Sequence, residues 1–286
     1  MLSRVETARE GERMHIGVTL RNMGEQSTAD TMATCALASE DAGMESIWVV
    51  DHIAIPPDDA EGSGGRYVDP LVSLAWLAGL TKSIRVGVGV LILPYRPQLP
   101  TAKQVASIQE LSRGRLLLGV GIGWMDPEFR ALGVNRRARG RISDETLAFL
   151  RDCFDGDDDV VTAHGQSFLF RPKPKAPPIY VGGAPPHALE RAARYGDGWL
   201  PMGMTASMLP ARKAQYAEYC DEAGREVGEV VVMGGLPSDA GAAADNLQAL
   251  AEAGASRFVF GGRYRDADEY RQRLDLLVAA RERMQA

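Results

Sequence analysis

Short apolar runs rich in β-branched residues alternate with longer stretches of helical period over most of the chain. This alternation predicts parallel strands joined by crossover helices. Eight such runs are present, which a closed (β/α)8 barrel requires and which exceeds the usual number in a doubly wound sheet. They cover residues 15–20, 46–51, 84–93, 115–120, 178–182, 198–201, 229–234 and 257–261. We therefore expect one TIM barrel domain over residues 14–286, preceded by a flexible N-terminal extension over residues 1–13.

Two helices between these runs have recognisable starts. Thr101 followed by Gln104 has the form of a capping box, and Gly114 marks the end of that helix. Ser27 and Asp30 open an earlier helix in the same way. Both helices fill intervals between predicted strands, so no linker is expected there.

Two segments are longer than ordinary barrel connections. Residues 53–69, after the second predicted strand, contain glycine, proline and acidic residues. Residues 135–178, after the fourth, contain the acidic run 157–159. Long loops on a barrel often cover its active face, and we expect both segments to be excursions of this kind.

The charge of the chain restricts its partners. The 286 residues carry a formal net charge of -6 and no basic tail, which argues against nucleic acid as the main partner. No window approaches the roughly 20 uninterrupted apolar residues of a membrane helix. The charged start lacks the apolar stretch of a secretory signal, so we expect a cytoplasmic protein without membrane contact.

The cysteines and the missing motifs exclude several classes of chemistry. Cys35, Cys153 and Cys220 lie far apart in predicted helices, so we expect small core residues rather than disulfides or a metal site. The sequence has no G-x-x-x-x-G-K-[ST], H-E-x-x-H, C-x-x-C or G-x-S-x-G motif. Nucleotide hydrolysis, zinc proteolysis and serine hydrolase chemistry therefore lose support.

Polar residues at the carboxyl ends of barrel strands face the active site. Asp51 and His52 follow the second predicted strand, where an acid and an imidazole can bind a ligand ring and exchange a proton near neutral pH. The alternative is that Asp51 caps a turn and His52 is an ordinary loop residue. This pair alone leaves both interpretations open.

Glycines mark the next three predicted strands. Gly87 and Gly89 indicate a bulge, contact with a flat ligand, or barrel curvature alone. The run 119–123 lacks the spacing of a dinucleotide fingerprint. Trp124, which follows it, either forms a wall of a substrate pocket or only packs against neighbouring side chains. Residues 182–184 precede a helix, so their amides form either a phosphate site or a tight connection.

Four arginines, Arg136, Arg137, Arg139 and Arg141, lie just before a helix in the second excursion. They could attract a multiply charged cofactor tail. An arginine cluster is more often a solvated face or a set of ion pairs, which is the alternative here.

Three segments occur in a fixed order. They read SIWVVDH, IRVGVGVLILPYRPQLPTAKQVASIQELSRGRLLLGVGIGW and PPIYVGGAPPHALERAARYGDGWLP. Together they resemble the bacterial luciferase-like flavin and deazaflavin oxidoreductases, over nearly all of residues 14–284. The resemblance implies a (β/α)8 barrel that binds FMN or coenzyme F420 at its carboxyl-terminal mouth, and the pattern is closest to the F420-dependent class.

The resemblance also implies a role for each matching position. Asp51 and His52 match the family's acid and histidine beside the cofactor ring, with the histidine handling a proton or steadying charge on the ring. Gly89 and Val90 match a non-proline cis peptide that bulges against the ring face. Two further sets match the turn lining the ring and the turn near the phosphate-bearing tail: Gly121, Ile122 and Gly123, and Val181, Gly182, Gly183 and Ala184.

One position departs from part of the family. Sugar-phosphate dehydrogenases of the F420-dependent class carry a glutamate as proton donor where this chain has Trp124, which argues against that activity and leaves Trp124 to the substrate pocket. Arginine outnumbers lysine by 27 to 5, as in GC-rich genomes, and bacteria with such genomes often make F420. We therefore predict coenzyme F420 as the cofactor, with FMN as the alternative.

The predicted function is an oxidoreductase without a metal that transfers a hydride between F420 and a small organic substrate held beneath residues 53–69. His52 is the predicted proton partner, beside Asp51. The alternatives are an FMN-dependent luciferase-like monooxygenase, a non-catalytic flavin or deazaflavin carrier, and a barrel aldolase or isomerase with His52 as its base. The resemblance also implies a homodimer.

Overall fold

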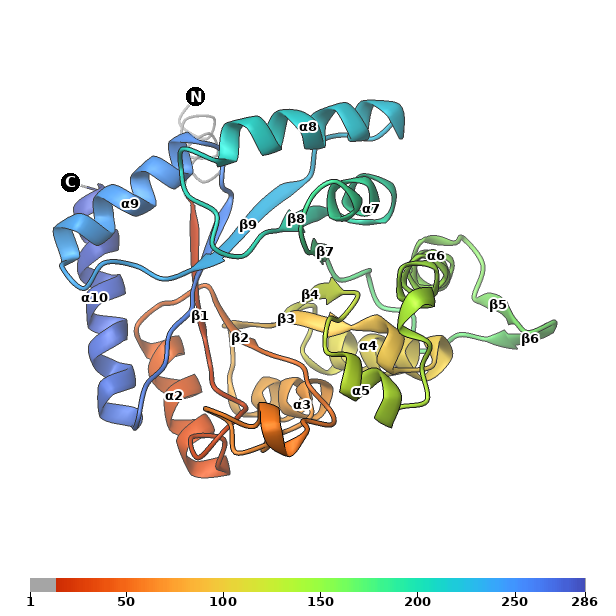
Figure 1. Ribbon diagram of the computed structural model, residues 1–286, viewed down its shortest axis with the longest axis horizontal. Coiled ribbons are helices and arrows are strands. Elements are labelled where there is room, and N and C mark those ends of the chain that lie inside the picture. The colour runs from red at the N-terminus through yellow and green to blue at the C-terminus, as the bar shows by residue number, and fades with distance from the viewer. Residues whose placement is uncertain (1–13, 286) are drawn as a thin grey trace, which may run out of the picture.

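The computed structural model describes residues 14–285 and contains a closed barrel of eight parallel strands. The strands follow one another around the barrel in chain order, and a separate hairpin of β5 and β6 stands outside it (Figure 1). The eight predicted strands and the (β/α)8 fold class are confirmed. The barrel strands are β1 (His15–Thr19), β2 (Ser46–Val49), β3 (Arg85–Ile92), β4 (Leu116–Gly121), β7 (Ile179–Gly182), β8 (Gly198–Leu200), β9 (Glu229–Gly234) and β10 (Arg257–Phe260).

Helices cover the outside of the barrel and return the chain to the start of the next strand (Figure 1). The α-helices are α2 (Ala29–Asp41), α3 (Pro70–Leu80), α4 (Gln98–Leu111), α5 (Asp126–Ala131), α6 (Arg139–Asp155), α7 (His187–Tyr195), α8 (Leu209–Glu222), α9 (Ala240–Glu252) and α10 (Ala267–Gln285). Short 3-10 helices, η1 (Pro57–Asp59), η2 (Leu93–Tyr95) and η3 (Arg136–Ala138), lie in the connections after β2, β3 and β4. These connections open at the carboxyl ends of the strands, where barrel enzymes carry their sites.

Both predicted helix starts are wrong. α4 begins at Gln98, and Thr101 lies one turn inside it, where its hydroxyl donates to the carbonyl of Pro97 at 2.8 Å. α2 is capped by Thr28, whose hydroxyl accepts a hydrogen bond from the amide of Thr31 at 3.2 Å. Side chains that can cap a helix also bond to the backbone one turn inside it, so residue type alone does not fix the cap.

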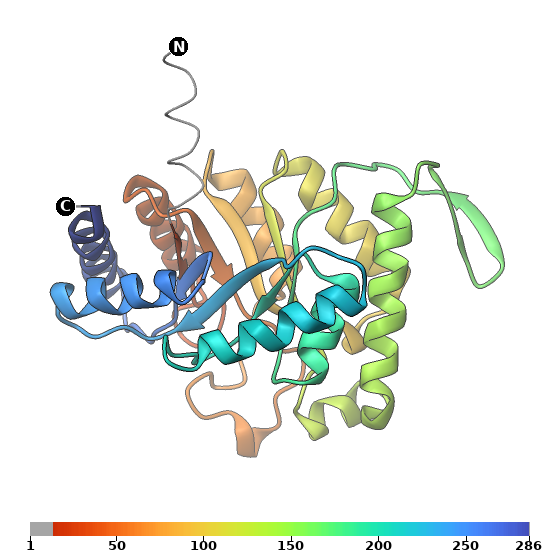
Figure 2. The ribbon, with the colours of Figure 1, turned by 90° about the horizontal axis from the view of Figure 1, so that it is seen from above.

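The first excursion and the hairpin of the second lie at opposite ends of the barrel (Figure 2). Residues 53–69 contain η1 and lie at the carboxyl ends of the strands, as expected. Residues 135–178 contain an ordinary barrel helix, α6, and the hairpin of β5 (Val160–Ala163) and β6 (Gln166–Leu169). α6 returns the chain to the amino ends of the strands, so the hairpin lies at the far end. The expectation that residues 135–178 cover the active face is therefore wrong for the hairpin, whereas η3, at the start of this segment, follows the carboxyl end of β4.

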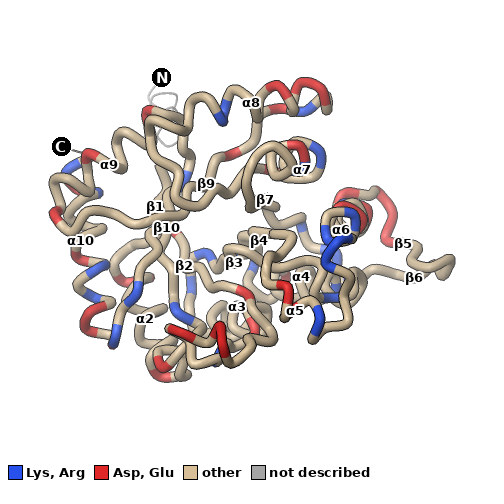
Figure 3. The backbone as a smooth tube through the Cα atoms, in the orientation of Figure 1, with Lys and Arg blue, Asp and Glu red and all other residues tan. Residues whose placement is uncertain are grey.

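Charged residues are spread over the outer helices and loops, and the acidic run 157–159 leads into the hairpin (Figure 3).

The interior of the barrel is filled by large side chains. Trp48 on β2 is fully buried, and an ideal Cβ on Gly87 would lie 2.6 Å from its indole. The packing of Trp48 therefore requires glycine at position 87, and contact with a ligand is not needed to explain this glycine. At the amino ends of the strands, Arg257 forms ion pairs with Glu45 and Glu229.

Other predictions concern single residues and segments. Cys35, Cys153 and Cys220 are free and buried, as predicted for core residues. Among the helices of residues 14–285, none combines the length and the apolar character that crossing a membrane requires. The predicted extension over residues 1–13 lies outside the described residues, and the domain boundaries remain predictions.

Candidate functional site

A cavity of about 380 Å³ opens at the carboxyl ends of β1, β2, β8, β9 and β10. Its size falls within the ~300–1,000 Å³ typical of small-molecule sites. Backbone forms much of its wall, because five of the lining residues are glycines, and the remainder is mostly apolar. The lining includes Gly203, Gly234, Gly235, Gly261 and Gly262, with Leu20, Met23, Val50, Met202 and Met233. Such a wall allows a flat group to lie against the main chain.

β3 carries a bulge at Gly89 and Val90. The register of β3 on β4 shifts between Val88 and Leu91, and the peptide bond between Gly89 and Val90 is cis. Gly89 and Leu91 are buried, whereas Val90 is only partly buried and packs on the cluster that contains Met233. The cis peptide implied by the family resemblance is therefore present at these two positions.

The side chain of Val90 accounts for two of the predicted glycines. An ideal Cβ on Gly121 would lie 2.5 Å from Cγ2 of Val90, and one on Gly182 would lie 2.7 Å from its Cγ1. Both distances are too short for van der Waals contact, so Val90 can occupy its place only because these residues lack side chains. Gly121 and Gly182 shape the site through Val90, and direct contact with a cofactor remains a prediction for both.

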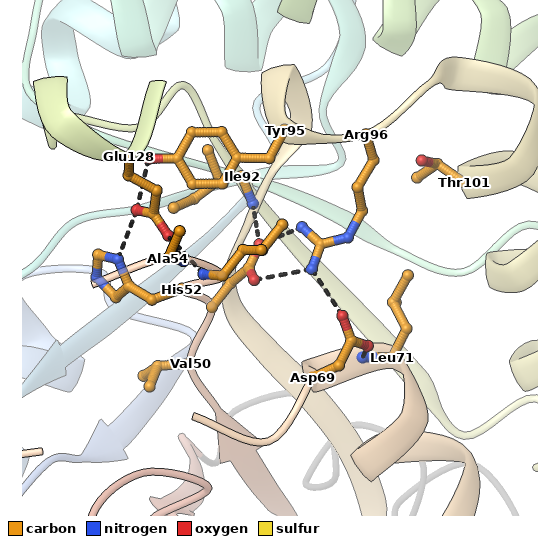
Figure 4. Close-up of polar contacts among 12 residues, drawn as sticks. Val50, His52, Ala54, Asp69, Leu71, Ile92, Tyr95, Arg96, Thr101 and Glu128 are labelled. Atoms are coloured by element: carbon orange, nitrogen blue, oxygen red, sulfur yellow. Dashed lines mark hydrogen bonds and ion pairs between the residues drawn. The ribbon is translucent and has the colours of Figure 1, made fainter. Parts of the chain in front are cut away.

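Asp51 is buried just after β2, and both oxygens of its carboxylate accept hydrogen bonds from other residues. Its oxygens accept hydrogen bonds from Nη1 and Nη2 of Arg96 at 2.6 and 2.9 Å and from the amide of Ile92 at 2.8 Å (Figure 4). Arg96 also donates to Asp69 at 2.9 Å. Burial lowers the pKa of Arg96, but its bonds to the two carboxylates outweigh this and raise the pKa above its ordinary value. Asp51 thus ties the end of β2 to the end of β3, and its catalytic role remains a prediction.

His52 is held by a buried carboxylate that the predicted site does not include. Nδ1 of His52 lies 2.9 Å from Oε2 of Glu128 (Figure 4). The hydroxyl of Tyr95 donates to the same oxygen at 2.8 Å, and the amides of Ile53 and Ala54 donate to Oε1 at 2.5 and 2.9 Å. The Glu128 side chain has no exposed surface. One carboxylate therefore joins α5, the end of β3 and the loop after β2.

These bonds fix the ionisation of Glu128 and the tautomer of His52. Burial raises the pKa of Glu128, but hydrogen bonds from His52, from two backbone amides and from Tyr95 outweigh burial and lower the pKa to about 2. Burial, reinforced by the neighbouring carboxylate, raises the pKa of Tyr95, which is therefore a neutral donor. A carboxylate only accepts hydrogen bonds, so Nδ1 of His52 carries a proton. Nε2 is left as the atom that can accept or release one.

Local packing explains where Glu128 stands. It lies in the first turn of α5, and the adjacent Phe129 packs edge-on against Tyr95 with ring centroids 5.0 Å apart. The contact between His52 and Glu128 joins residues 76 positions apart, so no local motif contains both. The feature of the sequence that could have identified Glu128 was an acidic residue at the start of a helix, shortly after a glycine run. Ile92, Leu132 and Val134 complete the apolar cluster around Tyr95 and Phe129.

Aromatic rings flank His52. The ring of Tyr67 lies edge-on at a centroid distance of 5.1 Å, and that of Trp124 at 6.1 Å. Trp124 is 65% exposed and Ile53, next to His52, is 45% exposed. This exposed apolar surface beside an imidazole suits an organic substrate. Ile122 and Gly123, both partly buried, lead from β4 to Trp124.

The turn after β7 changes from buried to exposed within four residues. Val181 and Gly182 are buried, whereas Gly183 and Ala184 are exposed just before α7. Gly183 has a φ of +126°, a conformation that favours glycine. Its carbonyl accepts a hydrogen bond from the indole of Trp199 at 3.3 Å. The role of this turn near a phosphate-bearing tail remains a prediction.

The four arginines before α6 do not converge on one site. Arg136 and Arg137 are exposed in η3, and Arg139 donates to the carbonyl of Arg136 at 3.1 Å. Arg141 pairs with Glu145 at 2.6 Å, one turn further along α6. These contacts fit a solvated face better than a binding cluster. Within residues 14–285, no group of three His, Cys, Asp or Glu side chains could hold a metal ion.

Known proteins similar to this chain include one with an assigned activity. It is named F420-dependent hydroxymycolic acid dehydrogenase, from Mycobacterium tuberculosis, and is 33% identical over 192 residues. The match covers 65% of this chain and 52% of that protein.

Two solved structures share the fold. An F420-dependent secondary alcohol dehydrogenase, in complex with an F420-acetone adduct, superposes with a TM-score of 0.79 at 16% identity over 94% of this chain and 99% of that chain. The oxygenating constituent of 3,6-diketocamphane monooxygenase from Pseudomonas putida, in complex with FMN, gives a TM-score of 0.74 at 15% identity over 93% and 97%. At these identities the likeness concerns the fold alone. Because the family profile described as luciferase-like monooxygenase matches residues 14–286, the chain belongs to the luciferase-like monooxygenase family.

Proposed function

We propose that this chain is an oxidoreductase that uses coenzyme F420 and exchanges a hydride between the deazaflavin ring and a small organic substrate. The observation that carries the proposal is a cavity walled largely by main chain at the barrel mouth, at the same end of the barrel as the imidazole of His52. The F420-dependent proteins among the relatives and structural neighbours support this choice of cofactor.

The residues present at the mouth fit a flat ring with a charged tail. A Cβ on Gly235 would meet no atom within 4 Å, so the main chain there is open to close approach. Val90 and the cavity glycines would hold the ring, and the turn at Gly183 and Ala184 would hold the tail.

The bound coenzyme would supply the hydride chemistry. His52 holds or moves a proton through Nε2, while Glu128 fixes the ring through Nδ1. Trp124 and Ile53 present apolar surface to a substrate beside His52. Asp51 acts through Arg96 as a positioning residue that keeps the ends of β2 and β3 together.

A titration of the protein with F420 and FMN separately, followed by absorbance and fluorescence, tests the choice of cofactor. We expect F420 to bind more tightly. Tight binding of FMN alone would overturn the choice and favour an FMN-dependent monooxygenase, the second candidate, to which the structural neighbour in complex with FMN points.

Stopped-flow measurements distinguish an enzyme from a cofactor carrier. The protein with bound reduced F420 is mixed with a panel of enones, imines and aldehydes, and the protein with oxidised F420 is mixed with alcohols. We expect at least one compound to accelerate the redox change. A cofactor that binds normally, with no compound altering its rate, would favour the carrier. The predicted homodimer remains a prediction, to be checked by light scattering.

A further inference from the structure

Arg21, just beyond β1, is a buried arginine without a carboxylate partner. It is 8% exposed, donates from Nε to the side-chain oxygen of Gln26 at 3.2 Å and donates from Nη2 to the carbonyl of Gly62 at 3.0 Å. No carboxylate in residues 14–285 forms an ion pair with it. A buried charge is costly unless it is paired.

Other arginines of the barrel show how this fold satisfies such a charge. Arg257 forms ion pairs with Glu45 and Glu229. Arg115 makes five hydrogen bonds to carbonyl and hydroxyl oxygens. Arg21 makes two, both to neutral groups, and its Nη1 donates to no atom of the described chain.

Arg263, which follows β10, brings a second guanidinium to the same place. An ideal Cβ on Gly62 would lie 3.5 Å from Nη2 of Arg263, so Arg21 and Arg263 both lie against Gly62. Arg263 is exposed, and its side chain makes neither an ion pair nor a hydrogen bond within residues 14–285. Two like charges near one another repel, and an anion between them would relieve this repulsion.

Both arginines line the cavity at the mouth, whose other residues are mostly apolar, and both also line a second cavity of about 460 Å³ that contains Glu25 and Glu269. Met23, in the same lining, is bridged to Tyr67, and the ring of Tyr67 packs edge-on against His52. The cavity is therefore connected through Met23 and Tyr67 to the imidazole, although neither Tyr67 nor His52 lines it. A complementary ligand has an apolar body and one anionic group.

We propose that Arg21 and Arg263 form an anion subsite that binds a carboxylate or phosphate group of a ligand whose apolar body fills the mouth. Guanidinium groups bind both anions through paired N–H donors. We assign the group to the substrate, a step that rests on the proposed oxidoreductase function. The cofactor tail is predicted at the turn after β7, and β7 stands four strands from β1 in the eight-stranded barrel, on the opposite side.

Binding of octanoate and octanol to the protein, measured by isothermal titration calorimetry, tests the subsite without a known substrate. We expect octanoate to bind at least about tenfold more tightly than octanol, because only octanoate pairs with the arginines. Arg21→Gln and Arg263→Gln should each weaken octanoate binding by about tenfold and leave octanol binding unchanged. The matched control is Arg271→Gln, which removes an exposed arginine of α10 that pairs with Asp268 and lines no cavity with Arg21 or Arg263.

Arg263→Gln keeps the test valid should Arg21→Gln fail to fold, because the side chain of Arg263 makes no hydrogen bond in residues 14–285. Equal binding of octanoate and octanol, or unchanged octanoate binding in Arg263→Gln, would overturn the subsite. The affinity for F420 identifies the source of the anion. An unchanged F420 affinity in both variants assigns it to the substrate, and a loss equal to that for octanoate assigns it to the coenzyme. Failure of F420 to bind the unmodified protein would overturn the proposed function and leave the octanoate result standing.

Discussion

Nδ1 of His52 lies 2.9 Å from Oε2 of Glu128, so the residue after β2 is hydrogen-bonded to the first turn of α5. Because Glu128 is buried and ionised, it holds one nitrogen of the imidazole and leaves the other for chemistry. Replacing each partner tests a different half of this relationship.

His52→Ala removes the proposed proton partner and leaves the glycine wall of the mouth intact. We expect kcat to fall by about 10²–10⁴-fold, the range for general acid–base catalysis. The dissociation constant of F420 should change by no more than a few-fold. Steady-state kinetics and a fluorescence titration measure the two quantities. Equal losses in both would make His52 a binding residue.

Glu128→Gln keeps an oxygen that can accept from Nδ1 of His52 and removes the negative charge. We expect kcat to fall by at least about tenfold, with little change in KM, because the ionised partner that orients the imidazole is lost. Tyr95→Phe is the control, since it removes one donor to the same carboxylate and keeps its charge. A Glu128→Gln enzyme with the original kcat would restrict Glu128 to a structural role.

Glu128 also predicts how stability depends on acid. Its pKa is about 2, against an ordinary value of 4.5. A group whose pKa is lowered by folding stabilises the protein above its unfolded pKa, and this contribution is lost as the pH falls from 4.5 to about 2. The shift corresponds to ~3 kcal/mol.

The free energy of unfolding of Glu128→Gln should therefore fall less steeply over this pH range than that of the unmodified protein. Urea denaturation at a series of pH values between 2 and 6 measures both slopes. Two parallel curves would show that Glu128 does not carry the acid sensitivity.

Gly183 tests the turn predicted to hold the cofactor tail. A Cβ there would lie 3.3 Å from Cβ of Ala188, and the φ of +126° disfavours any side chain. We expect Gly183→Val to weaken F420 binding by at least about tenfold, because the branched side chain distorts the turn and covers amides at the start of α7.

Gly165→Val supplies a matched control for Gly183→Val. Gly165 has a φ of +78° and lies in the hairpin at the other end of the barrel, so its replacement introduces backbone strain far from the mouth. Its F420 affinity should remain unchanged while its thermal stability falls. If Gly183→Val also retained full F420 affinity, the turn after β7 would no longer belong to the site.

The strands could be predicted because their signal is local. Both ends of β9 were predicted correctly, since a run of four apolar residues lies between Glu229 and Gly234. Helix caps were less certain, because both Ser27 and Thr28 have hydroxyls that suit a cap. The cis bulge at Gly89 and Val90 came from the family resemblance, and a strand pattern alone indicates only that glycine weakens the strand.

The sequence alone could not show why particular positions are glycine, because the side chains that leave no room for a Cβ there are distant along the chain. Gly87 accommodates the indole of Trp48, and Gly121 and Gly182 accommodate Val90. Glu128 was missed for a similar reason: its partner is defined by the closure of the barrel rather than by spacing along the chain. Sequence patterns thus predicted that His52 follows a barrel strand, while the contacts that orient His52 required the fold.

Replacing Asp51 tests whether this residue positions Arg96 or takes part in proton transfer. Asp51→Ala leaves Arg96, whose side chain is 10% exposed, with Asp69 as its remaining carboxylate. Breaking a buried ion pair costs ~3–5 kcal/mol, and we expect a loss of this size in the free energy of unfolding. Well below the melting temperature, kcat should stay within a few-fold of the original, since the carboxylate is already occupied by Arg96 and by the amide of Ile92.

The control for Asp51→Ala is Asp126→Ala, which removes an exposed ion pair with Arg130 one turn along the chain. Its stability should change by no more than ~0.5 kcal/mol, because exposed pairs contribute little. Urea denaturation of both variants and their kcat values at a common low temperature complete the comparison. A fall in kcat of about 100-fold in Asp51→Ala without a loss of stability would give Asp51 the catalytic role predicted from the sequence, because a carboxylate that mainly secures Arg96 cannot be removed without destabilising the fold.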